Sequence, residues 1–127
     1  MELCYNSDYA EVFWDAQNYM VFHVWKKACA FEEYRMPVKQ SLYFLRKNPG
    51  STFVVDARNG FEDDPKDVEW GFSYFLPEMK KSGCKKWIFI KEDDGGIDDE
   101  LDVWSMEIRK YFEVYCVNSL EKALRMI

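Results

Sequence analysis

The chain has 127 residues, of which 48% are hydrophobic and 31% charged, a composition typical of a folded domain rather than a disordered chain. Its 23 acidic and 17 basic residues give a net charge of −6, which repels phosphate backbones and anionic lipids and so disfavours nucleic-acid and membrane-surface partners. Because there is no bilayer-length apolar run, no signal-peptide pattern and no paired cysteine motif, we expect one cytoplasmic domain over residues 1–127 with reduced thiols.

The first elements are predicted to be a β-hairpin and a helix. Residues 9–14 and 19–25 have the apolar and aromatic character of strands, and the residues between them suit a turn. Residues 31–47 carry apolar side chains at helical spacing, which predicts an amphipathic helix that Pro37 either kinks or begins. Its apolar stripe consists of Phe31, Tyr34, Val38, Leu42 and Leu45.

A short buried strand over residues 53–55 follows and ends at Asp56. Asp64 and Pro65 have the residue types of an N-cap and a first helical position, and they predict the start of a second helix that ends near Gly83. The inward-facing stripe of this helix is predicted to be Val68, Phe72, Phe75, Leu76 and Met79.

The last elements continue the alternation of strand and helix. Residues 87–90 and 112–117 are predicted strands with a helix between them, and Asn118 and Ser119 are predicted to cap a final short helix. The inward residues of these two helices are Ile97, Leu101, Trp104 and Ile108, and then Leu120, Ala123, Leu124 and Ile127. This order predicts an α/β fold with a mixed, mostly parallel five-stranded sheet, an N-terminal hairpin and about four helices. It does not determine the order of the strands within the sheet.

The succession of segments resembles the STAS-like and SEC14-like domains that are related to anti-sigma factor antagonists. The resemblance rests on Phe31-Glu32-Glu33-Tyr34 at a helix start, Val54-Val55-Asp56-Ala57-Arg58-Asn59 at a strand end, and Glu69-Trp70 in the next helix. It continues with Phe75-Leu76-Pro77, Gly83 and Lys86-Trp87-Ile88-Phe89-Ile90, and so covers nearly the whole chain.

Membership of this family would imply a mixed sheet with helices packed on it and a non-enzymatic role in binding a partner protein. The best-known members are switched by phosphorylation of a serine near the start of the second helix. Residues 61–70 contain no Ser, Thr or Tyr, and Ser73 lies about two turns further along, so the switch is not carried over to this chain.

The sequence lacks the motifs of common enzyme classes. It contains no G-x-S-x-G, G-x-x-x-x-G-K-[ST], G-x-G-x-x-G or H-E-x-x-H pattern, and we expect no catalytic residues, no bound metal and no cofactor. The single histidine, His23, lies within a predicted strand with no motif around it and is interpreted as structural. Cys84 follows a glycine at a helix end and is interpreted as a small buried filler.

Asp56 ends a central strand, at the edge of the sheet where ligands of open α/β folds bind. Asp56, Arg58, Asn59 and Asp64 would form the rim of a ligand site there. One alternative is a phosphoacceptor or metal-dependent domain that uses Asp56, but no acidic pair ends the first strand to hold a magnesium ion. The preferred interpretation is that Asp56 accepts backbone hydrogen bonds and orders the following loop.

Two acidic loops follow successive strands. They contain Glu62, Asp63, Asp64 and Asp67, and then Glu92, Asp93, Asp94, Asp98, Asp99 and Glu100. If the two strands are neighbours, the loops share one rim and their oxygens could hold a hard cation. The spacing matches no EF-hand template, so a solvated acidic rim is preferred to a metal site.

The second helix offers the sharpest candidate for a binding surface. Trp70 and Tyr74 lie one turn apart and opposite the predicted core stripe, so we expect both rings on the solvent side. Exposed aromatic rings of this kind suit a protein partner or a second copy in a homodimer. The alternatives are that another element covers the two rings, or that Pro77 tilts the helix.

Three functions follow, in order of preference. The first is a non-catalytic STAS-like interaction domain that uses Trp70 and Tyr74. The second is a SEC14-like carrier of a small apolar ligand, in which surplus aromatic side chains such as Tyr43, Phe44 and Trp104 line a cavity. The third is an enzyme or phosphoacceptor built on Asp56.

Overall fold

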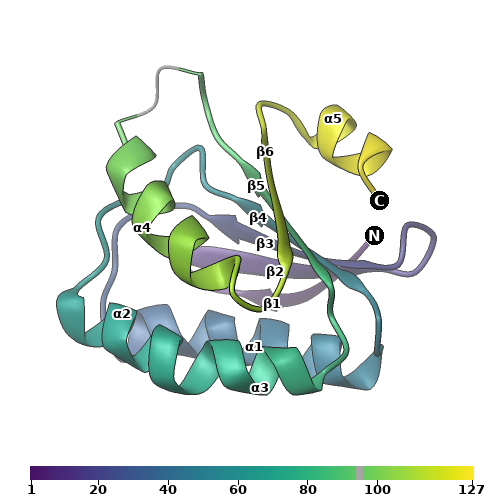
Figure 1. Ribbon diagram of the computed structural model, residues 1–127, viewed down its shortest axis with the longest axis horizontal. Helices are drawn as coiled ribbons and strands as arrows, with labels where there is room; N and C mark the ends of the chain where they lie inside the picture. Colours follow the sequence, from purple (N-terminus) through teal and green to yellow (C-terminus); the bar gives the residue numbers. More distant parts are fainter. Residues whose placement is uncertain (94–95) are drawn as a thin grey trace.

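The computed structural model describes residues 1–93 and 96–127, and within these ranges the chain forms one six-stranded sheet with helices on both faces (Figure 1). The strands are β1 (Glu2–Asn6), β2 (Ala10–Asp15), β3 (Met20–Trp25), β4 (Thr52–Asp56), β5 (Lys86–Ile90) and β6 (Glu113–Val117). The helices are α1 (Glu32–Lys47), α2 (Pro65–Trp70), the π-helical turn η1 (Gly71–Phe75), α3 (Leu76–Lys81), α4 (Asp98–Ile108) and α5 (Leu120–Arg125). The predicted α/β class is confirmed. Because α2, η1 and α3 form one continuous helix, the described residues contain the four helices that were predicted.

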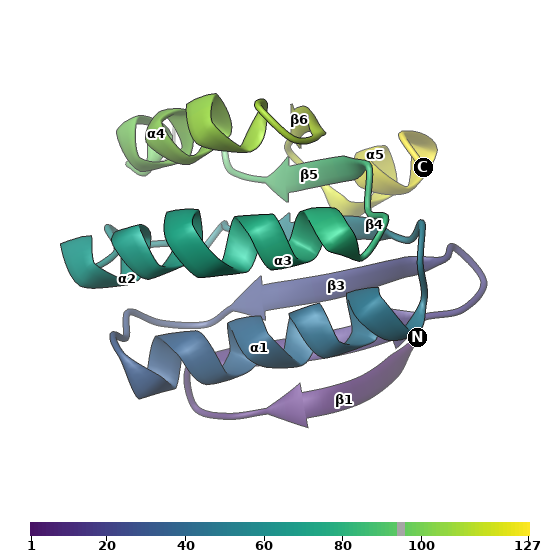
Figure 2. The ribbon, with the colours of Figure 1, turned by 60° about the horizontal axis from the view of Figure 1, so that its bottom comes forward.

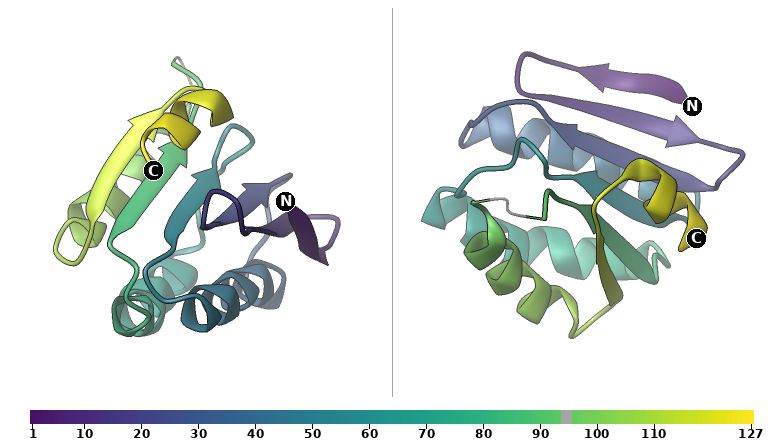
Figure 3. Two further views of the ribbon diagram at one scale, coloured as in Figure 1. Left: turned by 90° about the vertical axis from the view of Figure 1, so that its right-hand side faces the viewer. Right: turned by 90° about the horizontal axis from the view of Figure 1, so that it is seen from above.

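Every strand lies beside its neighbour in the sequence, in the order β1-β2-β3-β4-β5-β6. The β1–β2 and β2–β3 pairs are antiparallel, and the three later pairs are parallel. The parallel connections place α1, the α2–α3 helix and α4 on the same face, as successive right-handed crossovers in one direction require (Figure 2). The last helix, α5, covers the opposite face (Figure 3).

The prediction of five strands was wrong, because it omitted β1. This strand pairs with β2 alone and lies at the edge of the sheet, with a register shift between Leu3 and Tyr5. Its side chains are exposed or half-buried, and Leu3 is 48% exposed. An edge strand that packs so little needs no apolar alternation, and its sequence therefore carries no strand signal.

The sheet separates two apolar clusters by the alternation of side chains along each strand. Val21 and Trp25 of β3 face the cluster beneath α1, the α2–α3 helix and α4, whereas Met20 and Phe22 face α5. His23 shares the first face, since it lies between Val21 and Trp25 at the same period. This face therefore places a buried histidine under the helices.

Helix boundaries follow the predicted capping residues. The side chains of Asp64 and Ser119 accept hydrogen bonds from the backbone N–H groups of Lys66 at 2.9 Å and Lys122 at 3.1 Å. The prediction that Pro37 could begin the first helix was wrong, because α1 starts at Glu32. Ile127 was predicted to point inward but is 42% exposed, since α5 ends before it.

All four cysteines, each within the described ranges, are free thiols, as predicted. Cys84 is buried at 2% exposure, which confirms its interpretation as a filler. Among the described residues, no helix combines the length and the apolar character needed to cross a membrane.

The π turn η1 changes which residues of the long helix face inward. The N–H of Leu76 donates to the carbonyl of Gly71, five residues earlier, rather than to the residue four earlier. Pro77 favours this wider turn, because in a regular α-helix its ring would clash with the carbonyl of Ser73. The extra residue rotates the preceding turn by roughly 100° relative to the next one.

Gly71 is required where the π turn meets α4. A Cβ atom at this position would lie 2.3 Å from Cη2 of Trp104, well inside contact distance. Gly71→Ala is therefore expected to lower the free energy of unfolding by about 1–3 kcal/mol, although alanine favours helix by about 1 kcal/mol. Chemical denaturation measures this change, and Gly96→Ala is the control because its Cβ would have no atom within 4 Å. Equal stability of both variants would contradict the packing argument.

Candidate functional site

A cavity of about 70 Å³ lies between the sheet and the helices on its first face. Nine of the nineteen described residues that line it are Phe, Tyr or Trp, and they include four of the five tryptophans. The floor is made by β3, β4 and β5, through His23, Trp25, Phe53, Val55, Trp87 and Phe89. These side chains share one face because they occupy alternate positions on adjacent strands.

The walls of the cavity come from three helices. They are Tyr34 and Val38 of α1, Trp70, Gly71 and Phe75 of the long helix, and Leu101 and Trp104 of α4. Their rings hold one another in place: Trp25 stacks on Tyr34 with ring centroids 5.0 Å apart, and Phe53 meets Trp87 at 4.9 Å. The mouth consists of half-buried residues, namely Gly60, Phe61, Asp63, Ile97 and Glu100.

Two polar atoms on the floor lack a hydrogen-bond partner among the described residues: Nε2 of His23 and Nε1 of Trp87. Both residues line the cavity, at 1% and 4% exposure. Burial lowers the pKa of His23 to about 3, so its ring is neutral, and its Nδ1 lies 2.8 Å from Oγ of Ser41. Leaving such buried groups unpartnered costs about 1–3 kcal/mol each, which a bound molecule could recover.

The mouth of the cavity contains a half-buried carboxyl group, that of Asp63. Its Oδ2 accepts hydrogen bonds from the phenol of Tyr34 at 2.9 Å and from the indole Nε1 of Trp104 at 3.1 Å. Burial raises the pKa of Asp63 to about 7, the hydrogen bond from Tyr34 opposes this rise, and the nearby charge of Glu100 adds to it. Asp63 is therefore poised to change its charge near neutral pH.

A second carboxyl group, that of Glu100, lies beside it. Oε1 of Glu100 accepts a hydrogen bond from the backbone N–H of Asp63 at 3.3 Å, and burial raises the pKa of Glu100. The β4–α2 loop and the start of α4 therefore meet at the mouth.

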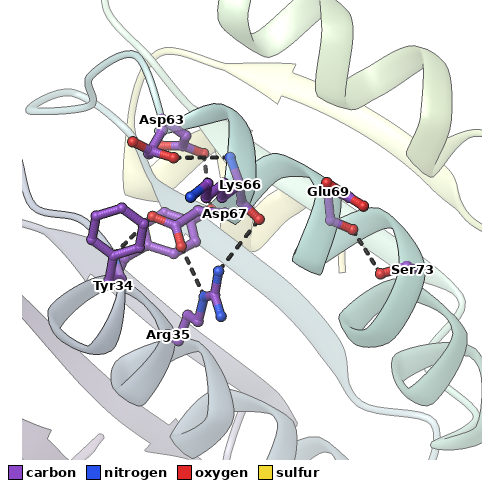
Figure 4. Close-up of polar contacts among 9 residues, drawn as sticks. Tyr34, Arg35, Asp63, Lys66, Asp67, Glu69 and Ser73 are labelled. Atoms are coloured by element: carbon purple, nitrogen blue, oxygen red, sulfur yellow. Dashed lines mark hydrogen bonds and ion pairs between the residues drawn. The ribbon is translucent and has the colours of Figure 1, made fainter.

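An ion pair between Arg35 and Asp67 ties α1 to α2 beside the mouth (Figure 4). Nε of Arg35 donates to Oδ1 of Asp67 at 2.8 Å, and Oδ2 of the same carboxylate accepts the backbone N–H of Phe31 at 2.9 Å. The guanidinium of Arg35 also lies 5.4 Å from the ring centroid of Trp70. This cluster fixes the helix ends that carry Tyr34 and Trp70 into the cavity wall.

The residues predicted as a ligand rim lie outside the cavity lining. Asp56 is on the α5 face by alternation, and its carboxylate accepts hydrogen bonds from the backbone N–H of Arg58 at 3.1 Å and from its guanidinium at 2.7 Å and 3.0 Å. Asn59 is exposed, and Asp64 caps α2. Because the strand order of the described sheet never reverses, the sheet has no topological switch point, and the aromatic cavity lies beneath the helices instead.

Trp70 and Tyr74 occupy different environments. Trp70 is half-buried, lines the cavity and stacks on Phe75 with ring centroids 6.3 Å apart, whereas Tyr74 is 40% exposed. The expectation that Trp70 faces solvent was wrong, because the π turn brings residues five apart onto one face. Binding of a protein partner through these rings stays a prediction.

Of the three aromatic residues proposed for an apolar cavity, Trp104 lines it. Tyr43 is 55% exposed, and Phe44 packs against the edge of the core. Spacing along the sequence could not separate these positions, because all three rings belong to amphipathic helices.

The two acidic loops do follow neighbouring strands, and Asp63 and Glu100 meet between them. Within residues 1–93 and 96–127, there is no group of three or more His, Cys, Asp or Glu side chains that could hold a metal ion. Asp94, which was considered with the second loop, lies outside the described residues.

Sequence reasoning did not bring His23, Trp87 and Asp63 together around one cavity, as the structure does. A histidine between apolar residues of a strand, and a tryptophan in the next apolar strand, both indicate a buried polar atom that needs a partner. Asp63 carries no such signal, because its burial depends on the contact with α4.

Comparison of the chain with protein-family models, with curated proteins and with solved structures gives no significant match in any of the three cases. The geometry of the cavity therefore carries the functional argument.

Proposed function

We propose that this chain is a non-catalytic domain of the STAS-like and SEC14-like kind that binds a small, mainly apolar molecule carrying a hydroxyl group. The observation that supports the proposal is the pair of unpartnered buried atoms, Nε2 of His23 and Nε1 of Trp87, in an aromatic cavity. Ligand sites of this kind combine apolar walls with a few polar groups that orient the ligand.

The size of the cavity limits the ligand. One water molecule needs about 10–15 Å³, so the space of about 70 Å³ suits roughly five or six non-hydrogen atoms. A hydroxyl group is the smallest group that can either accept the N–H of Trp87 or serve whichever tautomer His23 adopts. Ser41, the neighbour of His23, is fully buried and does not line the cavity, which argues against its use as a nucleophile on a bound molecule.

Titration with 1-pentanol, a hydroxyl group on a short apolar chain, tests this proposal. In ¹⁵N-labelled protein, we expect a saturable chemical-shift change of the Trp87 indole N–H, because that group would gain a hydrogen-bond acceptor. The indole of Trp14, which lies outside the cavity lining, should not respond. Trp87→Phe assigns the resonance.

A cavity-filling variant separates binding from folding. Val55→Phe places a ring on the cavity floor and should abolish the response while leaving the protein folded, since filling a cavity commonly stabilises by about 0.5–2 kcal/mol. Val24→Phe, the same change at a half-buried position of the opposite face, should leave the response of the Trp87 indole N–H to 1-pentanol intact. An unsaturable shift in the native protein, or an undiminished one in Val55→Phe, would refute the proposal.

A further inference from the structure

The mouth of the cavity contains two carboxyl groups, and neither has a cationic partner among the described residues. Asp63 and Glu100 both line the cavity, and none of the ion pairs among the described residues involves either carboxylate. Arg35, the cation that lies nearby, is held by Asp67. Two carboxyl groups therefore face a cavity whose walls are mostly aromatic.

Aromatic walls and carboxylates favour the same kind of ligand. The face of an aromatic ring attracts an organic cation, and a carboxylate accepts its N–H groups with charge assistance. Trp104 belongs to both parts of this arrangement, because its ring lines the cavity and its Nε1 holds Oδ2 of Asp63 at 3.1 Å. Tyr34 of α1 also belongs to both parts, because it lines the cavity and its phenol donates a hydrogen bond to Oδ2 of Asp63 at 2.9 Å.

We infer that the cavity selects a ligand whose hydroxyl-bearing apolar body ends in an ammonium group, held at the mouth by Asp63 and Glu100. The inference rests on the proposed function. The acidic pair would not carry it alone, but the buried unpartnered atoms of His23 and Trp87 in the same cavity independently point to a ligand. The hydroxyl group would meet the floor, and the ammonium group would stay at the half-exposed mouth.

This arrangement makes binding depend on pH. The charged or titratable groups around the Asp63 carboxyl are Cys29 before α1, Tyr34 and Arg35 of α1, Asp67 of α2 and Glu100 of α4. Burial raises the pKa values of Cys29, to about 12, and of Tyr34, so neither ionises near neutral pH. Asp63, with its pKa raised to about 7, therefore ionises between pH 6 and pH 8.

The test compares 4-aminobutan-1-ol with 1-pentanol, which has the same number of non-hydrogen atoms but a methyl group in place of the ammonium. Both are titrated at pH 6 and pH 8, with the Trp87 indole N–H as the readout. An alkylammonium group stays charged across this range, so the expected gain for 4-aminobutan-1-ol is about tenfold in affinity from pH 6 to pH 8, as Asp63 ionises. The affinity for 1-pentanol should change less than twofold.

Two variants assign the effect to the mouth. Asp63→Asn keeps an acceptor for Tyr34 and Trp104, and it should remove the pH dependence and weaken 4-aminobutan-1-ol binding about tenfold at pH 8. Glu100→Gln should weaken this ligand severalfold and keep the pH dependence. Asp99→Asn, an exposed neighbour that does not line the cavity, should change neither ligand.

The outcomes distinguish the two proposals. Equal affinities for both ligands at both pH values would overturn the ammonium inference and leave the proposed function standing. Tighter binding of 4-aminobutan-1-ol that survives in both Asp63→Asn and Glu100→Gln would also overturn the inference. If neither ligand shifts the Trp87 resonance, the proposed function fails and the inference fails with it.

Discussion

Replacement of Asp67 by alanine is expected to lower the free energy of unfolding by about 3 kcal/mol, the lower end of the range for breaking a buried ion pair. The side chain of Asp67 is fully buried and holds both the guanidinium of Arg35 and the backbone N–H of Phe31. Phe31 has a φ of 56°, a conformation that side chains rarely adopt, and this hydrogen bond fixes it. Arg35 is 27% exposed and can recover some hydration, which is why we expect the lower end.

Asp64→Ala is the matched control for this prediction, because it removes a carboxylate three residues earlier in the same segment. Asp64 is an N-cap whose side chain accepts one backbone hydrogen bond, so its loss should cost about 1 kcal/mol. Urea denaturation of both variants gives the comparison. If Asp67→Ala were no more destabilising than Asp64→Ala, the ion pair would not hold α1 against α2.

The pH dependence of stability should contain two large contributions of opposite sign. Burial lowers the pKa of His23 from 6.5 to about 3, so the unfolded chain binds a proton that the folded chain excludes, and stability falls as the pH drops below 6.5. Burial raises the pKa of Asp63 from 3.8 to about 7, so the folded chain keeps a proton that the unfolded chain releases, and stability falls as the pH rises from 3.8 to about 7. The two effects oppose each other between about pH 4 and pH 6.5.

Single variants should reveal each contribution. At about 1.36 kcal/mol per pKa unit, each group contributes roughly 3 kcal/mol between pH 7 and pH 4. When the pH is lowered from 7 to 4, the stability of Asp63→Asn relative to the native protein should fall by about this amount. Over the same change in pH, the relative stability of His23→Gln should rise by about as much. The remaining groups titrate alike in all three proteins, so chemical denaturation at the two pH values isolates the difference. Parallel pH profiles of the three proteins would contradict both assignments.

The fold could be predicted from the sequence where side chains are buried. The strands β3, β4 and β5 consist mainly of apolar residues, and α1 and α4 carry clear stripes, so their existence and their succession along the chain follow from the sequence pattern. The edge strand β1 could not be found in this way, because its exposed side chains carry no pattern. Strand order also stayed open, since crossovers of similar length fit more than one order.

The candidate site was less predictable, because it depends on contacts between distant segments. The π turn at Gly71 moves Trp70 into the cavity wall, and helical periodicity cannot anticipate a turn of different width. Asp63 gains its burial from Trp104 and Glu100, which lie about 40 residues later in the chain. Sequence reasoning placed the possible ligand rim at Asp56, because ligands of open α/β sheets bind at the carboxyl ends of strands, whereas the cavity lies beneath the helices.

The sequential strand order also bears on how the chain folds. In the sheet, each new strand adds to the edge formed by the one before it, so no strand must be inserted between two others. Contacts are therefore as local as parallel crossovers allow, which favours faster folding than an order with inserted strands would. During synthesis, the antiparallel strands β1, β2 and β3 can form first, and β4, β5 and β6 can then pair in turn, starting at the free edge of β3. The cavity closes only after α4 has been synthesised in this scheme, because Leu101 and Trp104 of α4 complete its wall.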